Sequence, residues 1–194
     1  MSLFTERHWE NELAEMRAAE RSEYDEMQRI YARMVRTARL SDCLRYRYSL
    51  GRRWGDLMAR SVLWVMLNPS TADADIDDNT IRKCIYFTHR EGFSRLHVVN
   101  LFAFRSTDPA AMLALPEDEA RGPENSDEVS FQARDADLIV CAWGVPGGKL
   151  IPEALWPYRG KCVHLGLNGD GSPKHPLYLA KTTPRNAATY SQRS

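Results

Sequence analysis

The sequence predicts an α/β protein, a three-layer α/β/α sandwich with a four-stranded parallel core sheet. Four apolar runs, at about residues 62–67, 96–104, 137–143 and 161–167, have the length and continuity of strands buried on both faces. Longer segments with helical patterns separate these runs, as in βαβ units joined by right-handed crossovers. The alternation of the two patterns is the basis of the predicted fold.

The composition excludes several classes of protein. The 194 residues carry 26 Lys and Arg against 26 Asp and Glu, so the chain is no polycation that binds nucleic acid by charge alone. Its four cysteines lack the C-x-x-C spacing of a zinc site and fit reduced thiols. No apolar segment reaches the about 20 residues of a membrane span, and the N-terminus is too acidic for a secretory signal. We therefore expect a cytoplasmic protein with no membrane partner, no metal and no cofactor.

The N-terminal residues predict a helical extension over residues 1–42, followed by the α/β/α domain over residues 43–194. From about Thr5 to Leu40 the chain is rich in Glu, Arg, Ala and Met and contains no Gly or Pro. Apolar side chains such as Leu13 and Ile30 recur at helical spacing within it. Two roles stay open: the helix packs on the domain, or it is an arm that forms a homodimer or binds another partner.

The elements of the domain can be ordered from residue 44 onward. Residues 44–50 alternate polar and apolar side chains, which is typical of a half-exposed edge strand, and residues 51–55 favour a turn. The strands are the four apolar runs. The expected helices lie at residues 79–91, 109–115, 124–133 and 149–158, and the tail at residues 168–194 is loop-like.

Two clusters of charge allow more than one interpretation. Nine arginines lie between Arg29 and Arg60 against two aspartates, which fits either a solvated surface or a patch that faces phosphates. The aspartates between Asp73 and Asp78 fit turn formation and the cap of the next helix, or a loose divalent-cation site. An EF-hand is excluded, because Asp78 stands at the position of the required glycine.

Polar residues follow each expected core strand at its carboxyl end. In a parallel α/β sheet the loops at this edge converge on one ligand crevice. Asn100 is informative, because a lone amide inside an apolar strand must find hydrogen-bond partners. The candidate site residues are Asn68, Ser70 and Thr71 after the first strand, Asn100 in the second, Trp143 and Gly144 after the third, and His175 and Tyr178 after the fourth.

The order of these motifs resembles a known family. LNPSTAD, DDNTIRKC, VVNLFAFRSTDP, AWG and HPLYL, between about Cys43 and Leu179, resemble the domain of unknown function 1643 family, whose name implies no activity. More distantly, the order is similar to the uracil-DNA glycosylase superfamily. That resemblance implies its α/β/α fold, with Asn68 positioning the attacking water, Asn100 reading the base and His175 stabilising the leaving base. Leu67 departs from the loop glycine of that superfamily.

We therefore expect a glycosylase-like protein that acts on a nucleobase, nucleotide or nucleic acid by hydrolysing an N-glycosidic bond. Asn68 and His175 are its expected catalytic residues, and the other candidate residues are expected to bind the substrate. Two alternatives stay open. One is a non-catalytic module that binds nucleotides or nucleic acid. The other is a metal-assisted phosphohydrolase that uses the aspartates from Asp73 to Asp78.

Overall fold

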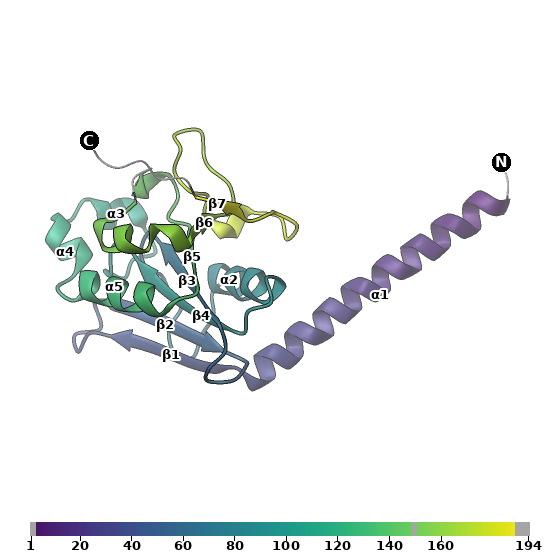
Figure 1. Ribbon diagram of the computed structural model, residues 1–194, viewed down its shortest axis with the longest axis horizontal. Coiled ribbons are helices and arrows are strands. Elements are labelled where there is room, and N and C mark those ends of the chain that lie inside the picture. The colour runs from purple at the N-terminus through teal and green to yellow at the C-terminus, as the bar shows by residue number, and fades with distance from the viewer. Residues whose placement is uncertain (1–2, 149–150, 189–194) are drawn as a thin grey trace. The chain divides into compact units, whose positions relative to one another are not determined.

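The computed structural model describes residues 3–148 and 151–188 of the chain (Figure 1). The chain divides into two compact units, Met1–Met34 and Val35–Ser194. Helix α1, Leu3–Arg33, makes up almost all of the first unit. Its continuity follows from the helix-favouring composition and the absence of Gly and Pro.

The prediction of a helix over residues 5–40 is wrong for residues 35–40. Residues Val35–Leu40 form strand β1, which pairs antiparallel with β2, Arg47–Arg53. Along β1 the side chains alternate between exposed and half-buried, and Val35 and Thr37 are β-branched, which favours a strand. The region expected to be a helical extension, residues 1–42, therefore includes a strand of the sheet.

The sheet has seven strands in the order β1-β2-β4-β3-β5-β6-β7 (Figure 1). The class is mixed α/β, as expected, but the sheet is mixed and seven-stranded where a four-stranded parallel sheet was predicted. Strands β4, β3, β5 and β6 pair in parallel, and β1, β2 and β7 add antiparallel pairs at the two sides. The remaining bounds are Ser61–Met66 for β3, Arg95–Asn100 for β4, Leu138–Cys141 for β5, Cys162–His164 for β6 and Asn186–Ala187 for β7.

The expectation of an edge strand at residues 44–50 with a turn at residues 51–55 is also wrong. Strand β2 continues through Gly51 to Arg53 and lies between β1 and β4, with nearly all of its residues buried. The alternating pattern of residues 44–50 came from Arg45, Arg47 and Ser49, yet Arg47 and Ser49 are buried, and so is Arg52 in the expected turn. An arginine fits inside a sheet layer when hydrogen bonds satisfy its donors, and the sequence pattern does not reveal those partners.

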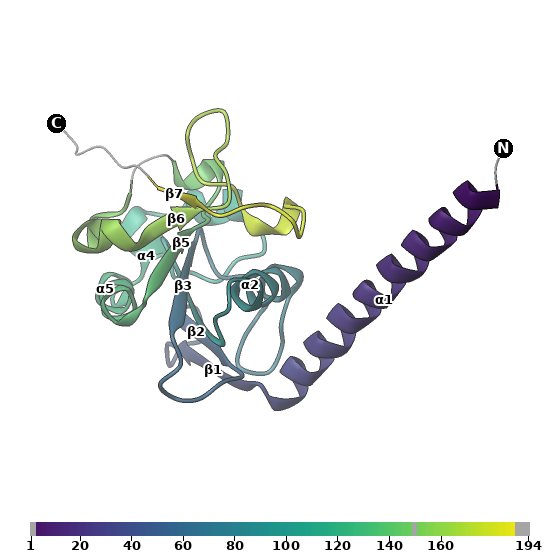
Figure 2. The same ribbon diagram turned by 45° about the vertical axis from the view of Figure 1, so that its right-hand side comes forward.

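Helices cover both faces of the sheet (Figure 2). On one face, α2, Asn79–Arg90, buries Ile81, Cys84 and Ile85, and Trp64 of β3 donates to the Thr88 hydroxyl at 2.9 Å. On the other, α5, Asn125–Asp135, packs Val129 and Ala133 against Leu63 and Val65 in the main core cluster. The apolar run of β3 is continuous because each face of the strand packs against a helix.

The shorter helices differ in part from the expected ones. Helix α3, Pro109–Leu113, begins where expected but ends two residues before the expected end, and α4, Glu117–Arg121, was not expected. Where an α-helix was predicted at residues 149–158, residues 149–150 lie outside the described residues and Glu153–Lys161 form the 3-10 helix η2, which contains Pro157. The tail expected to be loop-like contains the short helix η3, Pro176–Tyr178, and β7, while η1 spans Val145–Gly147. Every helix in the described part of the chain is too short or too polar to cross a lipid bilayer.

Candidate functional site

The loops that follow the parallel strands begin side by side. The Leu101 amide donates to the Met66 carbonyl at 2.9 Å, which joins the ends of β4 and β3. The Ala142 amide donates to the Val65 carbonyl at 2.8 Å and joins β5 to the other side of β3. The polar residues predicted after these strands are therefore carried by neighbouring loops, as the parallel topology requires.

Asn68 connects the loops after β3 and β4. Its Nδ2 donates to the Ser106 carbonyl at 2.8 Å and to the Pro69 carbonyl at 3.1 Å, and the Ser106 amide donates back to Pro69. Because carbonyl oxygens only accept hydrogen bonds, the amide atom that contacts them is the nitrogen, and the other atom is the oxygen, Oδ1. The half-buried side chain accepts no hydrogen bond at Oδ1 from any residue that the structure describes. Asn68 thus offers a fixed acceptor at the edge of the sheet.

His175 lies beside the loop that leaves β5. The Gly144 amide donates to the Pro173 carbonyl at 2.9 Å, and a Cβ atom built on Gly144 would lie 3.9 Å from the Cβ of His175. Gly144 has φ +75°, a conformation that favours glycine.

The hydrogen bonds of the His175 imidazole determine which ring nitrogen carries the proton. Nδ1 accepts the Leu177 amide at 3.4 Å, so the neutral ring carries its proton on Nε2.

Burial lowers the pKa of His175, and the nearby carboxylate of Asp78 acts in the opposite direction with a smaller effect. Desolvation favours the uncharged ring, so His175 is neutral at pH 7. With Nδ1 occupied as an acceptor, the ring presents Nε2–H as a donor.

Helix α2 holds the segment that follows His175. Lys83 donates to the Leu179 carbonyl at 2.8 Å, and Arg90 donates to the carbonyls of Lys181 at 2.6 Å and Thr183 at 2.7 Å. These bonds satisfy backbone acceptors of a segment that has little regular structure of its own. The position of His175 therefore depends on α2 as well as on the Gly144 loop.

The least expected feature of the site is a buried arginine bonded to Asn100. Arg47 of β2 is 2% exposed and Asn100 is 1% exposed. Arg47 donates from Nη2 to the Asn100 Oδ1 at 3.1 Å and from Nη1 to the Ala72 carbonyl at 2.8 Å. The sequence had predicted that Asn100 must find partners, but Arg47 had been assigned to a half-exposed strand and was missed.

Two nitrogen atoms of this pair have no hydrogen-bond partner among the described residues: Arg47 Nε and Asn100 Nδ2. A buried donor without a partner costs about 1–3 kcal/mol. Burial also lowers the pKa of Arg47 to about 10, against the favourable effect of the Asp78 carboxylate. The guanidinium still carries its charge at pH 7.

Asn125 supports the end of β4 from α5. Its Nδ2 donates at 3.0 Å to the carbonyls of both Asn100 and Leu101. Its Oδ1 is buried and lacks a partner within the described chain. This role could not be predicted from the sequence, because Asn125 and Asn100 are 25 positions apart and belong to different elements.

The aspartates from Asp73 to Asp78 have structural roles. Asp73 accepts the amides of Asp75 and Ile76 at 2.9 Å in a turn, and these bonds lower the pKa of its carboxyl group. Asp77 pairs with Arg52, and Asp78 accepts the Ile81 amide at 2.8 Å as the cap of α2. Across the described residues, no three His, Cys, Asp or Glu side chains are grouped so that they would hold a metal ion. The carboxylates of Asp73, Asp77 and Asp78 thus each accept hydrogen bonds from the protein, while Asp75 is exposed.

The arginines between Arg29 and Arg60 are largely engaged with the protein itself. Arg47 and Arg52 are buried, and Arg53 donates to the Gly55 carbonyl at 2.8 Å. Several others form ion pairs, with the partners Arg29–Glu26, Arg36–Asp77, Arg39–Glu128, Arg45–Glu119 and Arg60–Asp137. These five arginines, and Arg52 through Asp77, thus each face a carboxylate of the same chain.

The other predicted residues occupy different environments. Trp143 is 1% exposed, belongs to the core cluster and donates to the Gly148 carbonyl at 2.6 Å. Ser70 is half-buried and Thr71 is exposed. Tyr178 is 86% exposed, with its ring centroid 6.4 Å from that of His175. Asn68, Asn100 and His175 share no direct side-chain hydrogen bond within the described residues, although their loops are joined.

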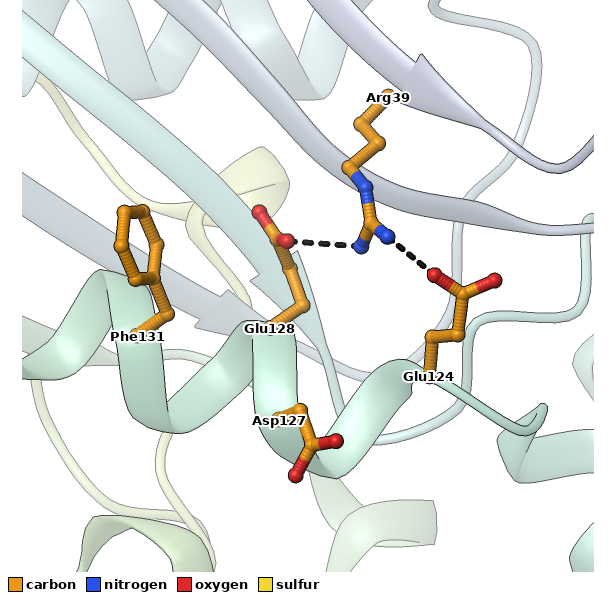
Figure 3. Close-up of a pocket in the computed structure, with 5 residues that line it drawn as sticks. All are labelled: Arg39, Glu124, Asp127, Glu128 and Phe131. Atoms are coloured by element: carbon orange, nitrogen blue, oxygen red, sulfur yellow. Dashed lines mark hydrogen bonds and ion pairs between the residues drawn. The ribbon is translucent and has the colours of Figure 1, made fainter.

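A pocket of about 230 Å³ lies elsewhere, between β1 and α5 (Figure 3). Its lining comprises Arg39, Glu124, Asp127, Glu128 and Phe131, and none of the predicted site residues. Arg39 donates to Glu128 at 2.8 Å and also to Glu124, and Asp127 points away from this pair (Figure 3). The charges of this pocket are thus mostly satisfied within the chain.

A family model described as protein of unknown function (DUF1643) matches residues 47–177, which include all the predicted site residues except Tyr178. Neither a curated protein nor a solved structure matches the chain.

Proposed function

The chain belongs to this family of proteins of unknown function, and we propose that it is a glycosylase-like hydrolase of an N-glycosidic bond in a nucleotide or nucleic acid. The observation that carries the proposal is the combination of a fixed amide acceptor on Asn68 with a neutral imidazole donor on His175. Both residues lie on loops at the carboxyl edge of the parallel strands, where α/β proteins bind ligands.

Asn68 would position the water that attacks the sugar. In this reaction the bond between C1′ and the base nitrogen breaks, the base leaves with the electron pair, and the water oxygen forms a bond to C1′. An acceptor that holds a water proton directs a lone pair of that water to the sugar carbon. The Oδ1 atom of Asn68 is suited to this, because the Ser106 and Pro69 carbonyls fix the other end of its amide.

His175 would stabilise the leaving base. Negative charge develops on the base as the bond breaks, and a fixed N–H donor near that charge lowers the barrier. A neutral histidine is effective here because it donates from Nε2 without a change in protonation. Burial lowers the pKa of His175, which supports this form of the ring at pH 7. The proton that the water releases then goes to the base or to solvent.

Tyr178 and Asn100 would supply substrate contacts. The exposed ring of Tyr178 offers a surface on which a base stacks. Asn100 would read the edge of a base that has left its stack.

The experiment is a search for released base. Purified full-length chain is incubated with nucleotides and with single- and double-stranded oligonucleotides that carry each common and deaminated base, and free base is measured by chromatography. We expect release from one substrate class, with a decrease of about 100-fold or more in Asn68→Ala and in His175→Ala. Matched controls are His164→Ala, another histidine whose pKa burial lowers, and Asn186→Ala, an exposed amide.

Three outcomes are informative. Release that depends on Asn68 and His175 but not on the control residues supports the proposal. Binding of the same ligands without any release indicates a non-catalytic binding module instead. No binding and no release with any probe contradicts both functions.

A further inference from the structure

Two arginines of β2 are buried, but the hydrogen bonding of only one of them is complete. Nε of Arg52 donates to the Asp77 carboxylate, and its other nitrogen atoms donate to backbone carbonyls. Arg47 has two side-chain hydrogen bonds among the described residues, to the Ala72 carbonyl and to Asn100 Oδ1. Its buried Nε atom has no partner there. Because a guanidinium carries five N–H donors, most of the donors of Arg47 are left for another group.

The buried charge of Arg47 also lacks a bonded carboxylate. Within the described chain, neither of its hydrogen bonds goes to an acidic side chain. Asp78 and Asp73 favour the charged form from a distance, but each carboxylate already accepts backbone amides of its own helix or turn. Burial lowers the pKa of Arg47 to about 10, so the side chain remains a cation at pH 7. A buried cation in this environment favours a ligand with negative charge.

A second guanidinium comes from the segment that pairs with this part of β2. Tyr46 and Phe104 form an isolated antiparallel bridge, and their ring centroids lie 6.0 Å apart. Side chains alternate along extended strands, so the next residues, Arg47 and Arg105, begin on the opposite face. Arg105 is half-buried, and its side-chain hydrogen bond within the described residues goes to the Leu44 carbonyl at 3.4 Å. The charge of Arg105 also lowers the pKa of Arg47, and an anion beside both would offset this repulsion.

We propose that Arg47 and Arg105 form an oxyanion site that binds a phosphate group of the substrate. Guanidinium groups suit this ligand, because their planar N–H groups match the arrangement of phosphate oxygens. The site lies at the carboxyl edge of the parallel strands, since Arg47 bonds both Asn100 at the end of β4 and the loop after β3. This inference rests on the proposed function and deepens it, because it names a phosphorylated substrate in place of a nucleoside or a free base.

Access to the free donors of Arg47 requires a local movement. Its Nε atom is shielded from solvent, and Ala72, whose carbonyl bonds the same guanidinium, is buried. The neighbouring Thr71 belongs to the same loop and is exposed. The proposal requires that the loop around Ala72 shifts when a phosphate enters, so that a phosphate oxygen accepts from the unpaired Nε–H.

The test compares ligands that share a base and differ in phosphate. Uridine and uridine 5′-monophosphate, adenosine and adenosine 5′-monophosphate, and inorganic phosphate alone are titrated into the full-length chain by calorimetry in a phosphate-free buffer. Each monophosphate should bind at least about tenfold more tightly than its nucleoside, because it forms charge-assisted hydrogen bonds. In Arg47→Met and in Arg105→Met this ratio should fall below about threefold. Arg53→Met is the matched control, since Arg53 lies on β2 and donates to the Gly55 carbonyl, and it should keep the native ratio.

A further titration separates the two sources of phosphate. A single-stranded oligonucleotide of uridine without terminal phosphates presents only phosphodiesters. Tighter binding of this strand than of uridine 5′-monophosphate assigns the site to a nucleic acid, and the reverse ranking assigns it to a mononucleotide. Either ranking supports the site if Arg105→Met weakens the tighter ligand, and contradicts it if Arg105→Met does not.

Arg105→Met also guards against loss of folding, because this half-buried side chain has one long hydrogen bond within the described residues. Its thermal unfolding should match that of the native chain. If Arg47→Met does not fold, the ratio measured in Arg105→Met decides the matter. Equal affinity for nucleosides and monophosphates, or an unchanged ratio in Arg105→Met, overturns the inference and leaves the proposed hydrolysis intact. Absence of binding by every probe overturns the inference as well, whereas the proposed function is decided separately by the search for released base.

Discussion

Arg52 and Asp77 form a buried ion pair, with 2.7 Å between Nε and Oδ1 and side chains that are 0% and 5% exposed. The same guanidinium donates from Nη2 to the Asp73 carbonyl at 2.6 Å. Arg52 thus fixes the loop between β3 and α2 to strand β2. This is the loop whose beginning carries Asn68 and whose end caps α2.

We predict that Arg52→Met destabilises the protein by about 3–5 kcal/mol. Removing Arg52 leaves the buried Asp77 carboxylate, among the described residues, with only the more distant Arg36, 3.7 Å away, and the loop carbonyls lose their donor. The measurement is urea unfolding at pH 7. Arg82→Met is the control, since Arg82 bonds the Asp77 carbonyl from an exposed position and should cost less than about 0.5 kcal/mol. Similar losses in both variants would contradict the role of the pair.

The cap of α2 gives a smaller predicted effect. Asp78→Ala should cost about 1 kcal/mol, because the Ile81 amide loses its acceptor, while Asp78→Asn keeps an oxygen at the same position. Thermal or urea unfolding measures the difference. The exposed Asp75 provides the control as Asp75→Ala. If Asp78→Asn destabilises the protein as much as Asp78→Ala, the Asp78 carboxylate stabilises α2 by its charge and not by accepting the Ile81 amide.

Stability should fall as the pH decreases from about 6.5 to about 4. Burial lowers the pKa of His97 from 6.5 to about 4, and its Nε2 accepts from Arg95 at 3.2 Å, which only the neutral ring can do. In this pH range the unfolded chain binds a proton that the folded chain does not, so acid favours unfolding. The loss attributable to His97 is on the order of 2–3 kcal/mol.

The check is urea unfolding at pH 7 and pH 4.5 for the native chain and for His97→Gln. The variant should lose less stability between the two pH values, with the remaining loss due in part to His164 and His175, whose pKa values burial also lowers. An unchanged pH dependence in His97→Gln would show that His97 does not titrate as proposed.

The bonds from α2 to the segment after His175 predict a local effect. Arg90→Ala should raise hydrogen exchange of the Thr183 amide and its neighbours by roughly tenfold or more, because two backbone carbonyls lose their donor. Exchange in the β3 core should not change. Arg82→Ala, on the same helix, serves as the control. Unchanged exchange around Thr183 in Arg90→Ala would mean that other contacts hold this segment.

The parts of the fold that depend on local patterns could be predicted from the sequence. The run from Val62 to Leu67 predicted a central strand because both of its faces are apolar, and the aspartates near Asp78 predicted the cap of α2 because the capping bond spans three residues. The position of Asn100 inside an apolar strand predicted that its side-chain amide needs hydrogen-bond partners. The loop positions of Asn68 and His175 also followed from the order of strands and turns.

The role of the arginines could not be predicted, because their partners are distant in the sequence. Arg47 bonds Ala72 and Asn100, which lie 25 and 53 positions away, and Arg52 bonds a carboxylate 25 positions away. Without those partners an alternating strand with arginines indicates an exposed face. Because Arg47 was assigned to an exposed face, β2 was predicted as an edge strand, and the hydrogen bond between Arg47 and Asn100 was not foreseen.

The central claim is most directly tested by single-turnover release of base, comparing the native chain with Asn68→Ala at pH 7. The substrate is the one identified in the search for released base, and the enzyme is in saturating excess. We predict that Asn68→Ala lowers the rate of base release by about 100-fold or more, while substrate binding changes little. Asn186→Ala should retain the native rate. Equal rates in the native chain and Asn68→Ala, or the absence of any base release by the native chain, would contradict the account.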